Sequence, residues 1–284
     1  MPGGQRDPAA PAQDSAEEVP RHNPWITLTT DFGTGSPYVG AMKGVILSYH
    51  PEARLVDITH EVPPQNIRMG AIILADATPY FPPGTIHVVV VDPGVGTERA
   101  LVYAELGTQR YLAPDNGVLT LVMKRSVLRR VIQLRESRFW RREISATFHG
   151  RDILGPVAAQ LARGLDPALL GPPHPALKVL EWPEPAVFPE LVEGQVIAVD
   201  SFGNLITNIE ERHIAGLGPR DQLQVESGRW IIDGLSRTYG EHPPGQLVSL
   251  IGSSGRLEVA VVCGNAAAVT GLDVDASVRI RPKR

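Results

Sequence analysis

One stretch, residues 85–91, constrains the fold of this chain more than any other, because it ends in four consecutive valines at positions 88–91. A strand exposed on one face alternates apolar and polar residues, whereas a parallel strand covered by helices on both faces is apolar throughout. The stretch therefore predicts a central strand in a largely parallel sheet that is covered on both sides.

Strand and helix patterns alternate around this stretch, as they do in proteins with a parallel sheet. Trp25–Thr30 has strand character, and residues 38–49 repeat apolar side chains at helical spacing. A strand at 54–58, a mostly buried helix at Ile67–Ala77 and two strands around Gly107 follow. This alternation predicts an α/β sandwich, a Rossmann-like arrangement, over residues 25–163.

The predicted first domain ends with a short helix at 117–123 and a helix at 152–163 that has Asp152 as its N-cap. Residues 164–193 contain seven prolines and no helical period, which favours an interdomain linker. From residue 194 to residue 284, short apolar runs alternate with turn residues and predict a small β-barrel or sandwich. These runs lie at 194–199, 205–209, 223–225, 230–232, Leu247–Ile251, 257–262 and 278–280.

Composition excludes several classes of protein. Residues 1–24 hold five prolines and lack the cationic start and apolar stretch of a signal peptide, so we expect a disordered tail and a cytoplasmic location. No window of 18 apolar residues indicates a membrane span. The formal net charge of −4 argues against general nucleic-acid binding. Cys263 is the only cysteine, which excludes an intramolecular disulfide and a cysteine metal cluster.

Polar residues stand where predicted strands end, which is where open α/β sheets bind ligands. Asp31 follows the first strand, where its carboxylate can accept hydrogen bonds from a ribose diol or cap the following turn. The glycines after it do not match the dinucleotide fingerprint, and no Walker-type phosphate loop occurs. The sequence therefore indicates no phosphate-bearing cofactor, which argues against a dinucleotide-dependent dehydrogenase.

The strongest candidate for chemistry follows the central strand. Asp92 precedes Pro93 and a glycine-containing loop that can bring Arg99 beside it, which would keep the aspartate ionised. His149 adds a titratable group in the same domain, and the three together suit the polarisation of a water molecule. A structural Asp–Arg pair and a structural histidine are the alternative. His60, His87 and His149 lack paired-ligand spacing, so no metal site is predicted.

Two polar segments of the second domain are candidate ligand contacts, although each also fits an ordinary β-turn. Phe202 offers a face on which a base could stack, and Asn204 can both donate and accept hydrogen bonds. Ser253 offers a short donor for a carboxylate. Its surroundings lack the Gly-x-Ser-x-Gly pattern, so it is not a nucleophile elbow.

Six short motifs follow one another between about residues 26 and 280, and their order is specific although each is weak alone. They are Thr30-Asp31-Phe32-Gly33, Asp57-Ile58-Thr59-His60, Val91-Asp92-Pro93-Gly94-Val95-Gly96-Thr97, Ala113-Pro114-Asp115-Asn116-Gly117, Thr147-Phe148-His149-Gly150-Arg151-Asp152 and Phe202-Gly203-Asn204-Leu205-Ile206-Thr207-Asn208. The chain thereby resembles the S-adenosyl-L-methionine (SAM) hydrolases, also called SAM hydroxide adenosyltransferases. That family is similar to the SAM-dependent fluorinase and chlorinase.

The resemblance implies an α/β domain followed by a smaller β-barrel, in a homotrimer whose active sites lie between one subunit's first domain and a neighbour's second. It implies that water attacks the ribose C5′ of SAM and gives adenosine and L-methionine, with SAM as substrate and no cofactor or metal. Methionine leaves as a neutral thioether, so its departure needs no general acid. The two other readings are a non-catalytic adenosine or SAM-binding module and a SAM-dependent halogenase.

The resemblance also implies roles for nine residues. The catalytic set falls on Asp92, Arg99 and His149, with Asp92 accepting a hydrogen bond from the water and either Asp92 or His149 taking its proton. The implied substrate contacts are Asp31 at the ribose hydroxyls, Phe202 and Asn204 on the adenine side, and Ser253, Glu258 and Val262 on the rest of the ligand. The halogenating relatives carry uncharged residues where this chain has Asp92 and His149. An ionised carboxylate a few ångströms from a chloride would repel it by about 4 kcal/mol at an effective dielectric near 20.

Overall fold

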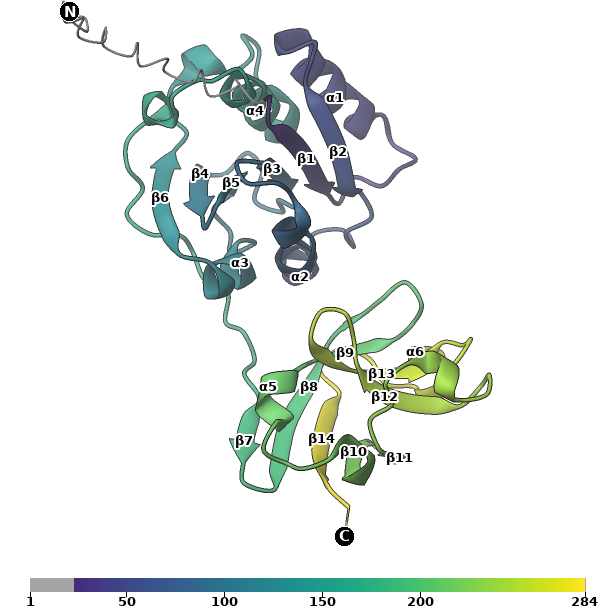
Figure 1. Cartoon of the computed structure of the whole chain (residues 1–284). Helices are drawn as coiled ribbons and strands as arrows, with labels where there is room; N and C mark the ends of the chain where they lie inside the picture. The colour runs from purple at the N-terminus through teal and green to yellow at the C-terminus, as the bar shows by residue number, and fades with distance from the viewer. Residues whose placement is uncertain (1–22, 284) are drawn as a thin grey trace, which may run out of the picture. The chain divides into compact units, whose positions relative to one another are not determined.

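The computed structural model describes residues 23–283 and forms two compact units (Figure 1). The first unit contains the described residues up to Gln65 together with Tyr80–Asp115 and Ser126–Ala176. The second unit contains Asn66–Pro79, Asn116–Arg125 and the described residues from Leu177 onward. Of the predicted tail, all but Asn23 and Pro24 lies outside the described residues.

The first unit is built on a six-stranded sheet in the order β2-β1-β3-β5-β4-β6. All neighbouring strands are parallel except β4, which is antiparallel to β5 and β6. Every residue of β3 is buried, so the prediction of a largely parallel sheet around the valine run is confirmed. The strands are β1 (Trp25–Thr30), β2 (Arg54–Thr59), β3 (Ile86–Val90), β4 (Leu101–Leu106), β5 (Gln109–Pro114) and β6 (Leu128–Gln133).

Helices alternate with these strands along the chain. Helix α1 (Pro37–Tyr49) begins with a proline, whose missing N–H is unused at that position. Helix α2 (Ile67–Ala77) is capped by the Asn66 side chain, which accepts from the Met69 N–H at 2.9 Å. Helix α3 spans Thr120–Arg125. The π-helix η3 (Gly150–Leu154) runs directly into α4 (Gly155–Ala162).

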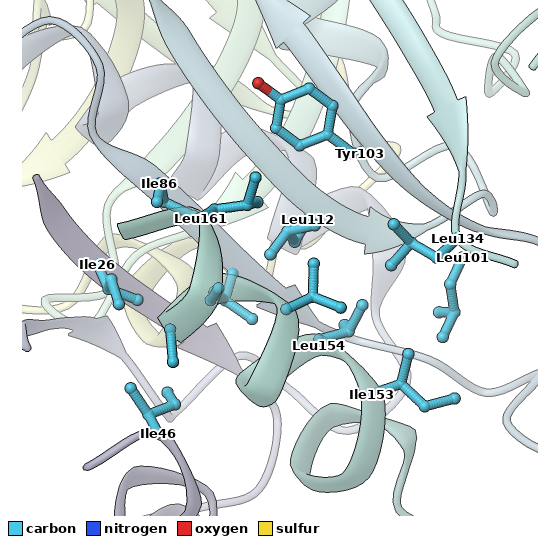
Figure 2. Packing of buried hydrophobic residues seen from close by; sticks show 14 of the residues in the cluster. Ile26, Ile46, Ile86, Leu101, Tyr103, Leu112, Leu134, Ile153, Leu154 and Leu161 are labelled. Carbon is cyan, nitrogen blue, oxygen red and sulfur yellow. The ribbon is translucent and has the colours of Figure 1, made fainter. Parts of the chain in front are cut away.

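Helices α1 and α4 pack against the sheet in the main core of the first unit. Figure 2 shows Leu154 and Leu161 among the strand residues Ile86 and Leu112. Complete burial of a leucine side chain contributes about 1.5–3 kcal/mol. This packing therefore anchors η3 and α4, and with them the segment that immediately precedes η3.

The second unit contains antiparallel strands in the order β11-β10-β14-β8-β9-β13-β12, with β7 also paired to β8. An isolated bridge between Ser236 and Leu250 lies near the open seam, so the sheet is a nearly closed barrel, as predicted. The strands are β7 (Ala186–Phe188), β8 (Leu191–Val199), β9 (Leu205–Glu210), β10 (Leu223–Ser227), β11 (Trp230–Asp233), β12 (Leu247–Ile251), β13 (Arg256–Val261) and β14 (Ser277–Pro282). Short helices α5 (Glu211–Ile214) and α6 (Ala266–Thr270) complete the unit.

Short 3₁₀ turns join these elements, at Thr78–Tyr80, Ser137–Phe139, Pro167–Leu170, Arg220–Gln222 and Tyr239–Glu241. One of them and strand β7 fall within the predicted linker, where Leu170 is buried. Strand β6 was not predicted, because its first three residues are exposed and two of them are arginines.

The prediction of Asp152 as a helix N-cap is wrong. The Asp152 N–H already donates to the Phe148 carbonyl at 3.1 Å, because η3 begins before it. Its carboxylate is fully buried and instead accepts hydrogen bonds from the Ser145 N–H and from the side chains of Arg141 and Arg151. Instead of capping a helix, the Asp152 carboxylate therefore holds the loop at Arg141 and Ser145 through hydrogen bonds.

Candidate active site

Two aspartates that are far apart in sequence meet at one edge of the sheet. Strands β1 and β3 are parallel neighbours, with Thr30 opposite Val90, so both end at the same edge. Asp31 and Asp92 follow these ends and line one cavity of about 60 Å³. The Asp31 N–H donates to the Val90 carbonyl at 3.4 Å, which ties the two strand ends together.

His149 reaches the same cavity from the N-cap of η3. Gly150 lies so close to β3 that a Cβ atom there would stand 2.9 Å from a methyl group of Val90. The absence of a side chain therefore lets the start of η3 approach the carboxyl end of β3. This approach brings His149 beside Asp92.

Arg99 holds the Asp92 carboxylate from one side. Its Nε lies 3.0 Å from Oδ1 and 2.8 Å from Oδ2, and its Nη2 also donates to Oδ2. The two side chains are only 8% and 6% exposed, so solvent screens the pair weakly. Oδ2 receives two of these contacts and Oδ1 receives only one, so Oδ1 retains a lone pair for another donor.

The same guanidinium fixes the protonation state of His149. Arg99 Nη2 lies 3.0 Å from His149 Nδ1. A guanidinium only donates hydrogen bonds, so Nδ1 is an acceptor and the ring is neutral with its proton on Nε2. Burial lowers the pKa of His149 below its ordinary value, and the Arg99 cation lowers it further. In this arrangement His149 offers an N–H donor.

The loop between Asp92 and Arg99 folds back through two turns. The Val95 N–H donates to the Asp92 carbonyl at 3.2 Å, and the Thr97 N–H donates to the Gly94 carbonyl at 3.1 Å. Gly96 has a φ of +81°, and a Cβ atom there would stand 2.6 Å from the Ala146 carbonyl oxygen. The loop thus lies directly against the segment that leads to His149.

We expect Gly96→Ala to reduce the SAM hydrolysis implied by the family resemblance at least tenfold. Relief of the clash with the Ala146 carbonyl must move the loop away from the segment that leads to His149. Gly84→Ala is the matched control, since Gly84 has the same φ of +81° but a Cβ atom there would meet nothing within 4 Å. Turnover rates and melting temperatures of both variants check the expectation. Equal effects of the two substitutions on turnover would contradict it.

Asp31 is fixed at the cavity edge by backbone contacts. Its Oδ2 accepts a hydrogen bond from the Gln65 N–H at 2.8 Å, which leaves Oδ1 for a ligand. Phe32, Tyr38 and Phe148 form a cluster of edge-on rings beside it, with centroid separations of 5.4–5.9 Å. These rings were given no role from the sequence, because their helical and turn positions carry no signal that they meet.

Four predicted ligand residues of the second unit also come together. Phe202, Asn204, Ser253 and Glu258 line one cavity of about 810 Å³. Phe202 is 74% exposed, whereas Asn204 is buried. Val262 does not line this cavity, because its side chain packs with Val248, Leu250 and Ala260. The adjacent Val261 packs in the barrel core and also lines the cavity.

Asp200 organises the loop that carries two of these residues, and it was given no role from the sequence. Its Oδ1 accepts from the N–H groups of Phe202 and Asn204, and its Oδ2 accepts from the Asn204 side-chain amide. One of the two hydrogens on Asn204 Nδ2 is therefore used by Asp200. The amide oxygen and the second Nδ2 hydrogen remain for a ligand.

Tyr239 is another cavity residue that sequence reasoning missed. Its hydroxyl donates to Glu258 Oε2 at 3.0 Å. Burial raises the pKa of Glu258 above its ordinary value, although the Tyr239 hydrogen bond opposes this shift. Burial and the nearby Glu258 carboxylate raise the pKa of Tyr239 to about 12. The wall of the cavity thus combines a neutral phenol with a carboxyl group that protonates more readily than usual.

Residues 23–283 contain neither a metal-ligand cluster nor a membrane span. No three or more His, Cys, Asp and Glu side chains in this range are grouped so that they could hold a metal ion. No helix in the same range is both long enough and apolar enough to cross a membrane.

Comparisons with known proteins match most of the chain to one protein family. The family model for the SAM hydroxide adenosyltransferase N-terminal domain matches residues 26–171, and the family model for the C-terminal domain matches residues 194–279. The chain is 40% identical over 262 residues to the (R)-S-adenosyl-L-methionine hydrolase of Thermus thermophilus, covering 90% of this chain and 98% of that protein. It is 37% identical to the enzyme of the same name from Salinispora tropica, covering 90% and 97%.

Solved structures and halogenating enzymes extend the comparison. The crystal structure of an uncharacterized conserved protein from Thermotoga maritima has a TM-score of 0.85 and 37% identity, and the match covers 90% of this chain and 99% of that one. The fluorinase of an Actinoplanes species is more distant, with 27% identity over 75% of this chain and 80% of that protein.

Proposed function

Because this chain belongs to the SAM hydroxide adenosyltransferase family, we propose that it hydrolyses S-adenosyl-L-methionine to adenosine and L-methionine. The observation that carries the proposal is the Asp92–Arg99–His149 cluster at the sheet edge, which holds two polar groups ready for one water molecule. The two hydrolases described above are named for the (R) sulfonium epimer, and we assign the same epimer to this chain.

The reaction needs little from the protein beyond positioning and proton removal. The water oxygen forms a bond to the ribose C5′ while the C5′–S bond breaks, and the electron pair of that bond goes to sulfur. The positive sulfonium becomes a neutral thioether, so the leaving group needs neither a proton nor a metal. A water held in line with the C5′–S bond about 3–3.5 Å from C5′ is in a near-attack geometry.

We assign the proton to Asp92. His149 Nδ1 is occupied by Arg99 and its Nε2 carries hydrogen, so His149 donates to the water oxygen and orients its lone pairs. Asp92 is the neighbouring acceptor, and Arg99 holds it in place through both carboxylate oxygens. The sequence left open whether Asp92 or His149 takes the water proton, and this division of roles supports Asp92.

The substrate contacts follow the two cavities. We assign the ribose hydroxyls to Asp31. Its Oδ2 accepts from the Gln65 N–H, and its Oδ1 is left to accept from the ribose. Phe202 and Asn204 are assigned to adenine, and Ser253 and Glu258 to the rest of the ligand, because all four line the larger cavity. For the contact predicted at Val262, the neighbouring Val261 is the better candidate because it lines that cavity.

A chromatographic assay tests the activity. Purified protein is incubated with each SAM epimer, with and without chloride, and the products are separated. We expect equal amounts of adenosine and methionine from the (R) epimer, unaffected by chloride. Formation of 5′-chloro-5′-deoxyadenosine would instead indicate a halogenase, and SAM that stays bound and intact would indicate a binding module.

We also propose a homotrimer in the cytoplasm, in which the first unit of one subunit supplies Asp31, Asp92 and His149 and the second unit of a neighbour supplies the larger cavity. The support is that each cavity is lined by residues of one unit alone, so that neither holds both sets of predicted contacts. Sedimentation analysis of the full chain measures the assembly. A stable, fully active monomer would contradict the arrangement.

A further inference from the structure

A second Asp–His pair lies beside the Asp31 turn, and the proposed reaction does not use it. His60 Nε2 lies 3.0 Å from Asp57 Oδ1, and Lys43 Nζ lies 2.5 Å from Asp57 Oδ2. The other ring nitrogen, His60 Nδ1, lies 2.9 Å from the hydroxyl of Thr30. His60 is 5% exposed and Thr30 is fully buried, whereas Asp57 and Lys43 lie nearer the surface.

The contacts of this group define one direction of hydrogen bonding. The carboxylate of Asp57 only accepts, so the His60 proton lies on Nε2 and Nδ1 accepts from the Thr30 hydroxyl. The Thr30 oxygen in turn accepts from the Phe32 N–H at 3.3 Å. The Phe32 N–H, the Thr30 hydroxyl and His60 Nδ1 therefore form one hydrogen-bonded path, and Asp57 faces the other ring nitrogen at ion-pair distance.

The backbone of His60 holds the same turn. Its carbonyl accepts from the Gly33 N–H at 2.8 Å, and the Thr30 carbonyl accepts from the Val62 N–H at 3.3 Å. Contacts from residues 60–62 thus bracket Asp31 on both sides along the chain. Burial alone would raise the pKa of Asp57, but hydrogen bonds from Lys43 and His60 outweigh it and lower the pKa, so the acceptor at the end of the path stays charged.

We propose that His60 is a positioning residue for recognition of the ribose: with Asp57 and Thr30 it fixes the turn at residues 30–33 so that Asp31 Oδ1 faces the ribose hydroxyls. The proposal rests on the proposed function only through the ribose role of Asp31. It assigns the Asp57-Ile58-Thr59-His60 motif to selection of ligands that carry the ribose diol.

Thr30→Val removes the hydroxyl at the centre of the path, and strand β1 offers a matched control. Thr27 contacts His87 Nδ1 at 2.7 Å and is also fully buried, but this pair does not touch the Asp31 turn. Thr27→Val therefore breaks a similar Thr–His contact three residues away. Thr30→Ser keeps the hydroxyl and is the rescue variant.

The readout is the ratio of affinities for adenosine and 2′,3′-dideoxyadenosine, measured by calorimetry on the full chain. We expect Thr30→Val to reduce this ratio at least tenfold, and Thr27→Val and Thr30→Ser to leave it near the wild-type value. A general loss of stability would weaken binding of both nucleosides and leave the ratio unchanged. If Thr30→Val does not fold, Asp57→Asn tests the same path from its more exposed end, with a smaller expected reduction.

The outcomes separate this proposal from the proposed activity. A ratio that stays at the wild-type value in Thr30→Val and Asp57→Asn overturns the positioning role. A wild-type protein that binds both nucleosides equally overturns it together with the ribose role of Asp31, whatever the hydrolysis assay shows. A wild type that hydrolyses no SAM but loses its adenosine preference in Thr30→Val overturns the activity and supports the positioning role.

Discussion

Asp92→Asn is expected to reduce the turnover of SAM by a factor of about 10²–10⁴, the usual contribution of a general base. The substitution keeps the size of the side chain, but a neutral amide cannot take the water proton. It also replaces one of the two oxygens that Arg99 contacts. Initial rates of adenosine release measure the effect, and calorimetry with adenosine separates loss of turnover from loss of binding.

The control for Asp92→Asn is Asp76→Asn, which also neutralises an aspartate paired with arginine. Asp76 contacts Arg125 and Arg256 and lines neither candidate cavity. We expect the control variant to lose stability but to keep its turnover. An Asp92→Asn protein that retained more than about a tenth of wild-type turnover would contradict the assignment of the proton to Asp92.

The pH profile provides a second reading of the same site. The pKa of His149 lies below the ordinary histidine value of about 6.5. The ring therefore stays neutral until the pH falls below that value. Protonation would place a hydrogen on Nδ1, facing the Arg99 guanidinium, and would break the contact that orients the ring. The acid limb of the wild-type kcat/KM profile should therefore lie below pH 6.5.

Asp152→Asn is expected to lower the free energy of unfolding by about 3 kcal/mol at pH 7, because the partly exposed Arg141 and Arg151 lose the charge of their buried acceptor. The Asp152 carboxylate is fully buried and receives four hydrogen bonds, from Arg141, twice from Arg151 and from the Ser145 N–H. It ties the loop before His149 to helix η3. We therefore expect turnover to fall as well.

The effect of Asp152 on stability should depend on pH with a defined sign. Burial alone would raise the pKa of Asp152, but the hydrogen bonds from Arg151, Ser145 and Arg141 outweigh it and lower the pKa to about 2. A carboxyl group with a lowered pKa stabilises the fold above its unfolded-state pKa and loses this contribution as the pH falls toward its folded-state value. The difference between wild type and Asp152→Asn should thus narrow between about pH 4 and pH 2.

Urea denaturation at several pH values measures this difference. Glu184→Gln is the exposed counterpart, since Glu184 pairs with Lys124 where the two side chains are 62% and 41% exposed. That variant should change stability by no more than about 1 kcal/mol. A similar cost for both substitutions would contradict the role of Asp152 in holding the loop before His149.

Much of the fold could be predicted because its signals are local. The valine run and the apolar period of residues 38–49 reflect burial of nearby side chains, and the turn glycines mark backbone conformations that other residues rarely adopt. The largely parallel sheet of the first unit and the barrel of the second could therefore be inferred. Strand β6 was missed because its edge position leaves Arg129 and Arg130 exposed, which removes the apolar signal.

The sequence by itself determined which chemical groups this protein has available: an aspartate after each of two parallel strands, an arginine seven residues beyond one of them, and a histidine before a helix. Only the tertiary structure decided how they are used. The orientation of His149 depends on Arg99, the role of Asp152 on a loop that folds back over it, and the place of Tyr239 on Glu258 nineteen residues away. Hydrogen-bond partners distant in sequence set these states, and residue spacing carries no record of their geometry.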